Sequence, residues 1–198
     1  MSLLRIGAIW GLAMVMVAGC ASRSPSPEYY RLILSAGIPD NSLSGFSLVV
    51  GPTSIPERLD KEDIQQPGDS GMLTGSDLKR WSEPLDDALS QELAWYLGGR
   101  APEMEVVAYP WPAGIKPDVQ VSLQVTRFEV MPSGHLELSG TLILSSLHGN
   151  ELQQTQRFMI TEQVSEPTVS QLVAAHNRAA TQLGEKILEL LGKALNHH

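Results

Sequence analysis

The feature that most constrains this chain is an uncharged apolar run, Ile6 to Ala18, which ends just before the only cysteine, Cys20. Arg5 gives the run a short basic start. The run is shorter than the about 20 apolar residues that a membrane-spanning helix needs, and it has the length of the hydrophobic region of a secretory signal. We therefore expect residues 1–19 to be removed as a signal peptide, so the rest of the chain must build the fold.

The sequence Val17-Ala18-Gly19-Cys20 has the pattern of a lipobox, where a diacylglyceryl group is attached to a cysteine thiol and the chain is cleaved before that cysteine. Cleavage between Gly19 and Cys20 leaves Cys20 first, with acyl chains such as palmitate on its sulfur and amine. Each buried CH₂ contributes roughly 0.8 kcal/mol, so two or three chains anchor a protein effectively permanently. The residue after Cys20 is not aspartate, which is typical of lipoproteins sorted to the periplasmic face of the outer membrane. The alternatives are an uncleaved anchor and an ordinary signal peptide with a chance cysteine.

The mature chain has the size of one domain and an acidic charge. It keeps 198 − 19 = 179 residues, enough for one well-filled core, and a charge of 13 − 22 = −9 once Arg5 is lost. An acidic chain without a basic run is a poor candidate for binding nucleic acid. With Cys20 acylated no thiol remains, which excludes disulfides and thiolate chemistry.

The first part of the mature chain predicts a tether and several short elements. Residues 20–27 contain two prolines and read as the lipidated cysteine and its tether, and residues 28–198 as the domain. Apolar and aromatic runs predict strands over 28–34, 46–50 and 104–109, with weaker short strands at 62–66 and 72–74. A helical stripe predicts a helix over 81–97, with Trp81 on the stripe, Ser82 as N-cap and Gly98-Gly99 as its end.

The second part predicts a β-meander followed by a long helix. Alternating apolar residues predict strands over 119–130, 136–144 and 152–160, with a bulge near Thr126 where the phase slips. Thr168 and Gln171 form a capping box before an amphipathic helix that runs to Ala194. The expected fold is α+β, an α/β sandwich in which a mixed, largely antiparallel sheet packs against two long helices in a single domain.

A search for chemical motifs predicts no enzyme. The turn at 68–71 (Gly-Asp-Ser-Gly) resembles a protease nucleophile turn, but the next glycine is absent and no histidine precedes it. His135 and His148 lie at predicted turns, and His176 lies on the last helix. We therefore expect no catalytic residues, no metal and no cofactor beyond the covalent diacylglycerol and N-acyl chain on Cys20; a hydrolase would need a nucleophile and a base within hydrogen-bond reach.

A series of short motifs in a fixed order resembles a known family. The motifs are Tyr29-Tyr30-Arg31-Leu32, Val50-Gly51-Pro52, Ile55-Pro56 with Leu59-Asp60, Arg80-Trp81-Ser82-Glu83-Pro84-Leu85-Asp86, Tyr109-Pro110-Trp111 and Val125-Thr126-Arg127-Phe128. Together they resemble the ABC-type transport auxiliary lipoprotein family, the family of paraquat-inducible protein C. The chain departs from the family pattern at Arg58, often a tyrosine, at 62–65, and in 139–142, where members often have a tryptophan.

The resemblance implies a non-enzymatic part in lipid transport across the bacterial envelope. Such lipoproteins sit at the outer membrane and dock an MCE-domain protein that forms a tunnel across the periplasm, or serve with an ABC permease. A homo-oligomer that matches a ring-shaped tunnel is a further expectation. A different reading is a lipid-binding shuttle or chaperone, which would need an apolar cavity of several hundred Å³ between sheet and helices.

Four residues are candidates for contact with a partner. Trp111, between two prolines and close to Tyr109, is suited to present an exposed aromatic hot spot. Arg127, at the phase slip, either pairs with a carboxylate such as Asp86 or faces a partner. Trp81 is assigned to the core more readily than to an interface, because it lies on the helical stripe.

Overall fold

The computed structural model describes residues 25–35, 37–39, 43–68, 72–75, 77–149, 153–166 and 168–195. The predicted lipobox, the lipidated Cys20 and residues 69–71 of the Gly-Asp-Ser-Gly turn lie outside these residues. Among the described helices, none is both long enough and apolar enough to cross a membrane.

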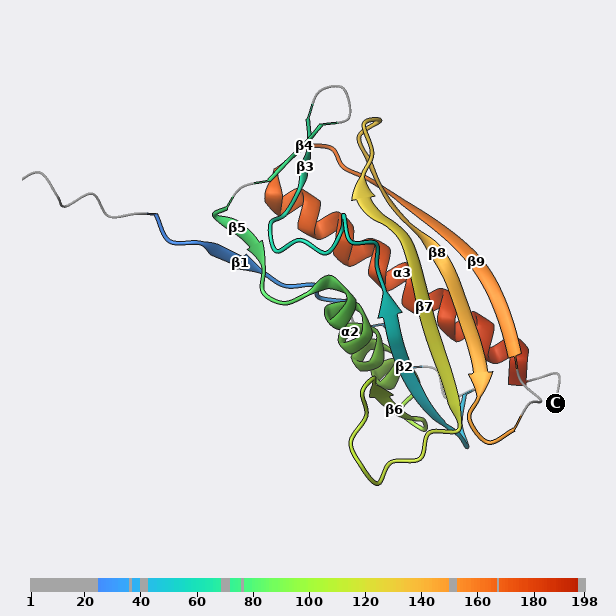
Figure 1. The fold of residues 1–198 in the computed structure, drawn as a ribbon. Helices are drawn as coiled ribbons and strands as arrows, with labels where there is room; N and C mark the ends of the chain where they lie inside the picture. Colours follow the sequence, from blue (N-terminus) through green and yellow to red (C-terminus); the bar gives the residue numbers. More distant parts are fainter. Residues whose placement is uncertain are drawn as a thin grey trace, which may run out of the picture.

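The predicted α+β sandwich is confirmed: the described part of the chain forms one mixed five-stranded sheet and two helices, with two small ladders beside them (Figure 1). The sheet has the order β6-β2-β7-β8-β9, and its bounds are β2 (Ser47–Ser54), β6 (Glu105–Ala108), β7 (Val119–Val130), β8 (His135–Ser146) and β9 (Gln153–Gln163). Both helices, α2 (Leu85–Arg100) and α3 (Val169–Leu195), cover the same face of the sheet. Two small ladders lie beside it: β1 (Glu28–Tyr30) with β5 (Lys79–Trp81), and β3 (Gln66–Pro67) with β4 (Leu73–Thr74).

Strands β7, β8 and β9 form the antiparallel meander that the alternation predicts. The predicted bulge is confirmed, since the register between β7 and β8 shifts between Val125 and Arg127. On either side of the bulge, the apolar residues of β7 face the helices and the polar ones face solvent. The bulge therefore keeps Phe128 and Val130 in the core after the phase of the sequence slips.

Strand β2 lies between β6 and β7 and runs parallel to both. Its pairing with β7 lapses between Val50 and Thr53, as expected at Pro52, which has no N–H to donate. The predicted end of the strand at this point is wrong, because pairing resumes at Thr53 and Ser54. Gly51 has a φ of 108°, and a Cβ there would lie 2.9 Å from Cβ of Tyr109, so this crossing requires glycine.

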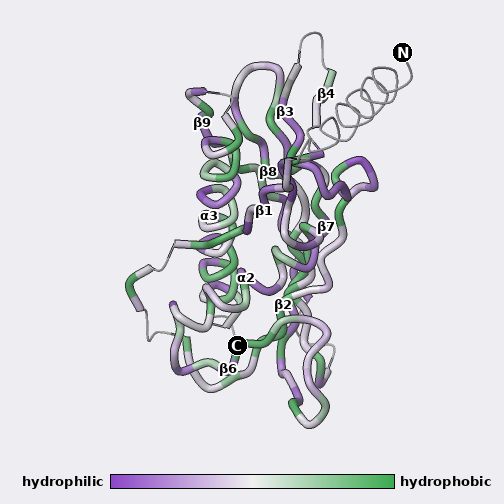
Figure 2. Tube along the Cα trace, turned by 90° about the vertical axis from the view of Figure 1, so that its left-hand side faces the viewer, coloured by the Kyte–Doolittle hydropathy of each residue, from purple (hydrophilic) through white to green (hydrophobic). Residues whose placement is uncertain are grey.

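The core lies between the sheet and the helices. On α3 the buried residues recur at helical spacing: Leu172, Ala175, His176, Ala179, Ala180, Leu183, Ile187, Leu190, Leu191 and Ala194. Figure 2 shows α3 alternating between hydrophobic and hydrophilic residues along its turns, as expected of an amphipathic helix that is half covered. At its start, the Gln171 N–H donates to Thr168 Oγ1 over 3.4 Å, which supports the predicted cap.

The prediction of the first helix is wrong at both ends. α2 begins at Leu85. Pro84 has an extended backbone (φ −55°, ψ 138°), and helical backbone angles are disfavoured for the residue that precedes a proline. Trp81 belongs to β5, which pairs in parallel with β1, and Ser82 caps nothing. At the other end the helix continues through Gly98-Gly99 to Arg100, whose guanidinium donates to the carbonyl of Ile38 over 2.6 Å.

Two predicted strands are shorter or displaced. The strand predicted over 28–34 is limited to β1, although the chain beyond it keeps the alternation of buried and exposed residues. The strand predicted over 62–66 reduces to a single bridge between Asp63 and Arg80, and the neighbouring ladder uses Gln66–Pro67. The second segment bonds to β5, since the Ile64 N–H donates to the carbonyl of Lys79 over 2.9 Å.

Candidate partner-binding site

Trp81 lies in the core. Its side chain is 7% exposed, and its ring meets the ring of His176 edge-on, with centroids 5.2 Å apart. Phe128 packs on the other side of the same imidazole, with centroids 4.6 Å apart. Trp81 therefore contributes to packing beneath β7 and is not available to a partner on the surface.

Tyr109 and Trp111 form an aromatic pair at one end of the sheet. Their rings meet edge-on, with centroids 5.9 Å apart and planes at 65°. The Tyr109 N–H donates to the carbonyl of Val50 over 2.8 Å, which fixes the segment to the end of the paired part of β2. Tyr109 is exposed and Trp111 is half-buried, so the pair offers one tyrosine edge supported by a tryptophan. Such an arrangement suits an interface anchor, because the rings are already ordered before binding.

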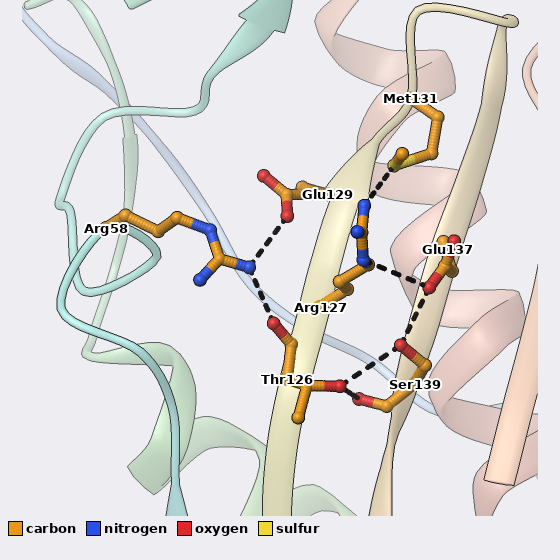
Figure 3. Close-up of polar contacts among 7 residues, drawn as sticks. All are labelled: Arg58, Thr126, Arg127, Glu129, Met131, Glu137 and Ser139. Carbon is orange, nitrogen blue, oxygen red and sulfur yellow. Dashed lines mark hydrogen bonds and ion pairs between the residues drawn. The ribbon is translucent and has the colours of Figure 1, made fainter.

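Arg127 lies in a polar cluster on the outer face of the sheet, which we call the bulge cluster: Arg58, Thr126, Arg127, Glu129, Glu137 and Ser139 (Figure 3). The two residues of the bulge, Thr126 and Arg127, are both exposed. Thr126 Oγ1 donates to the carbonyl of Ser139 over 3.0 Å, and Ser139 Oγ donates to Glu137 over 2.8 Å. The bulge thus gathers side chains of β7 and β8 that a regular ladder would separate.

Arg127 pairs with Glu137, at 3.4 Å, and not with Asp86, the carboxylate named as an example. Its other contact is a long one, from Nη1 to the sulfur of Met131 at 3.4 Å. The side chain remains 45% exposed, whereas that of Glu137 is 13% exposed. Glu137 thus holds one side of the Arg127 guanidinium, and the other side is open to solvent. This orientation suits contact with an acidic or carbonyl group of a partner.

Arg58 completes the bulge cluster from the loop that follows β2. It donates to the carbonyl of Thr126 over 2.6 Å and pairs with Glu129 at 3.0 Å. Figure 3 shows Arg58 reaching β7 from the side opposite to Glu137. The two arginines and two glutamates of the bulge cluster therefore carry no net charge. A partner would be recognised through the positions of these groups more than through long-range electrostatic attraction.

Sequence reasoning found Arg127 but missed its neighbours. In the sequence, Arg58 stands out only as a departure from a family pattern, and Glu137 is one of the residues of the strand predicted over 136–144. The signal for Glu137 was present, since a bulge moves the residues opposite it into the reach of both bulge residues. No signal in the sequence ties Arg58 to β7, because that contact joins residues 68 positions apart.

The buried His176 has no catalytic surroundings. Its Nδ1 lies 2.7 Å from the carbonyl of Leu172, and burial lowers its pKa to about 4. A small pocket beside it, lined by Trp81, Phe128 and Leu85 among others, has a volume of about 30 Å³, which is the share of one water molecule in the liquid. This pocket is far too small for an acyl chain. Larger hollows of about 450–550 Å³, one of them between α2 and β6, are grooves open to solvent and not enclosed cavities between sheet and helices.

One contact meets the distance required of a nucleophile and a base. Ser133 Oγ lies 2.8 Å from Nδ1 of His135, at the turn between β7 and β8. Within the described ranges no carboxylate orients this imidazole, and no group of three or more His, Cys, Asp or Glu side chains could hold a metal ion. We interpret the contact as a hydrogen bond that stabilises the turn.

Comparisons with known proteins agree with this geometry. Residues 30–188 match the model of a family described as the ABC-type transport auxiliary lipoprotein component. A crystal structure of a protein from Xanthomonas campestris superposes with a TM-score of 0.69 at 16% identity, covering 86% of this chain and 100% of that one. A crystal structure described as an uncharacterized protein has a TM-score of 0.67 at 19% identity, covering 84% and 99%. These two likenesses show a common fold, and no curated protein matches the chain.

Proposed function

Because the chain belongs to the ABC-type transport auxiliary lipoprotein family, we propose that it is a lipid-anchored docking component of an envelope transport system. In this proposal, acylated Cys20 holds the domain at the periplasmic face of the outer membrane. The domain binds the distal end of an MCE-domain protein, or of an MCE protein linked to an ABC permease, that carries phospholipid or other hydrophobic cargo. It catalyses no reaction itself.

The observation that carries the proposal is the contrast between a filled interior and an ordered outer surface. Most side chains between α2, α3 and the sheet are buried, with exposed fractions of 0–8%, and those of the edge strand β6, such as Val106 and Ala108, are partly buried. The ordered polar and aromatic groups, in contrast, lie outside, in the bulge cluster and in the Tyr109–Trp111 pair. A protein that binds cargo needs room inside, whereas a protein that docks a partner needs a rigid surface.

The lipobox supports the membrane part of the proposal. The motif Val17-Ala18-Gly19-Cys20 precedes a short tether, and the family takes its description from lipoproteins. A homo-oligomer is consistent with this role, because several copies around the end of a ring-shaped tunnel would share its symmetry.

Copurification from native membranes tests the docking role. The full-length protein and its Arg127→Glu variant would be captured by a C-terminal tag after mild detergent extraction, and the associated proteins would be identified by mass spectrometry. Arg127→Glu should reduce the recovered MCE protein at least about tenfold, the effect of losing one interface hot spot. Trp111→Ser should act in the same direction, since it removes the support of Tyr109.

Arg178→Glu is the matched control. Arg178, on α3, pairs with Glu162 and is 48% exposed, so the change breaks a comparable ion pair on the helix side of the sheet, away from the bulge cluster. This variant should recover the MCE protein as the native chain does. Equal recovery with all variants, or no MCE protein with the native chain, would contradict the docking proposal.

A further inference from the structure

The chain that leads from the anchor into the domain lies as an extended strap over the two helices. The strap, residues 31–35 and 37–39, continues the direction of β1 with a period of two. Leu32 and Leu34 point inward and are 2% and 1% exposed, whereas Arg31 and Ile33 point to solvent. In Figure 2 this segment crosses in front of α2 and α3, on the side of the helices away from the sheet.

Side chains of the helices replace the missing strand neighbour. The Ile33 N–H donates to Asn177 Oδ1 over 3.0 Å, and the Ser35 N–H donates to Thr181 Oγ1 over 3.2 Å, one helical turn further along α3. From the other side, Glu92 of α2 accepts from the Leu34 N–H over 3.4 Å. The strap is therefore fixed to both helices, and its outward side chains are held in place.

The outward side of the strap is apolar. Tyr29, Ile33 and Ile38 are 63%, 54% and 85% exposed, and Trp95, one turn along α2 from Glu92, is 61% exposed. We call these four residues the strap face. Large exposed hydrophobic side chains along one strap and the helix beneath it are of the kind that marks an interaction surface.

Ion pairs neutralise several of the charged groups beside the strap. Arg31 lies 3.6 Å from Glu92, Lys79 pairs with Glu28, and Arg100 pairs with Glu185. Tyr29, at the start of the strap face, also lines a hollow with the charged residues Asp60, Lys61, Glu62 and Glu83. The strap face would therefore contact lipid through its apolar side chains and not through electrostatic attraction.

The tether places this face close to the proposed anchor. From Cys20 to Glu28, where β1 begins, there are 28 − 20 = 8 residue steps, which span at most about 29 Å when fully extended. Strand β7 alone, with 12 residues, is about 40 Å long, so the extended tether is shorter than the domain. The part of the domain closest to the anchor along the chain is therefore β1, followed by the strap.

We infer that the strap face rests on the surface of the bilayer that holds Cys20, with Trp95 and Tyr29 at the lipid–water interface. The inference rests on the acylation of Cys20 in the proposed function. Tryptophan and tyrosine suit this position, because each has an apolar body and a polar group that remains hydrated. The domain is then held in one orientation, with the outer face of the sheet and the bulge cluster directed away from the lipid.

Quenching of tryptophan by brominated lipid tests this orientation. The mature acylated protein would be reconstituted in vesicles of phosphatidylethanolamine and phosphatidylglycerol, with and without brominated acyl chains. Its tryptophans after cleavage are Trp81, Trp95 and Trp111, of which Trp81 is buried. In a Trp111→Phe variant, brominated lipid should reduce the tryptophan fluorescence. The emission maximum should also lie at shorter wavelength in vesicles than for the unacylated protein in solution.

Trp95→Phe is the matched variant, since it keeps Trp111 and Trp81. It should lose most of the quenching, and both variants should retain the circular dichroism of the native protein. Quenching of Trp111 in place of Trp95 would overturn the inference, because the segment after β6, and not the strap face, would then face the bilayer. Equal tryptophan fluorescence with and without brominated lipid in both variants would also overturn the inference. This is the result expected if a second copy or another protein covers Trp95.

The same sample separates this inference from the proposed function. Flotation of the vesicles with bound protein, together with an acylated N-terminal peptide, establishes the anchor independently of Trp95. A protein that floats without quenching of Trp95 contradicts the orientation alone. A protein that does not float contradicts the anchor, and with it both proposals.

Discussion

His176 is a titratable base placed inside the core, between the rings of Trp81 and Phe128. Burial disfavours the imidazolium and lowers the pKa from 6.5 to about 4, although the carbonyls of Leu172 and Phe128 favour the charged form. The folded protein therefore keeps this histidine neutral under conditions where the unfolded chain protonates it.

The stability of the protein should consequently fall as the pH is lowered. Above pH 6.5 neither state binds a proton at His176; between about pH 6.5 and 4 only the unfolded state does, which lowers the free energy of unfolding by up to about 3 kcal/mol. Urea denaturation of the native domain and of His176→Leu at pH 7 and pH 4.5 measures this effect. The variant should lose less stability between the two pH values. The same loss in both proteins would show that His176 does not carry the pH dependence.

The segment around Trp81 shows why the spacing of apolar residues predicts a helix where the structure has a strand. Trp81 and Leu85 are four positions apart, which fits a helical stripe, but both are buried for different reasons. Trp81 is placed by parallel pairing of β5 with β1, whose partner Tyr30 is distant in sequence, and Leu85 is placed by the start of α2. Local spacing cannot distinguish these cases, because it contains no information about the distant strand.

At the scale of elements, the parts that could be predicted are those held by near neighbours in the chain. The meander and its bulge follow from the alternation in β7, β8 and β9, which are joined by short turns. The cap of α3 also follows from the local Thr168-x-x-Gln171 pattern. The parallel neighbours of β2, and Arg58 in the bulge cluster, were not predictable, because they bring together residues 50 or more positions apart.

The strap was predicted as a strand because its alternation is that of a strand. Its inward residues do alternate with outward ones, but the partners of its amides are Asn177, Thr181 and Glu92 on helices. A period of two indicates an extended backbone with one buried side, and it does not identify what covers that side.

The strap should contribute to stability through its inward side only. Leu34→Ala should lower the free energy of unfolding by about 2–4 kcal/mol, because the side chain is 1% exposed and its removal leaves a cavity between the helices. Ile33→Ala, one position earlier, should change it by less than about 1 kcal/mol, because Ile33 is 54% exposed. Urea denaturation of both variants provides the comparison. A similar loss in the two would show that the strap is not packed in this way.

At the scale of the whole molecule, both helices cover one face of the sheet and the bulge cluster lies on the other (Figure 1). The strap is bonded to the helices, and Tyr109–Trp111 follows the end of β6, where Trp95 of α2 and Ala108 of β6 line one hollow. In the proposed arrangement, an anchor on the strap side leaves the bulge cluster directed away from the lipid, whereas Tyr109–Trp111 follows directly on the hollow beside Trp95. The three proposals, anchor, orientation and docking, are thus compatible in one arrangement.

Intact and peptide mass spectrometry of the native protein, isolated from membranes of its own cells, tests the central claim most directly. The account predicts a chain that begins at Cys20, with a mass increased by a diacylglyceryl group on sulfur and an acyl group on the amine, found in the outer-membrane fraction. A chain that retains residues 1–19, or one that begins at Cys20 without acyl groups and is recovered in the soluble fraction, would contradict it.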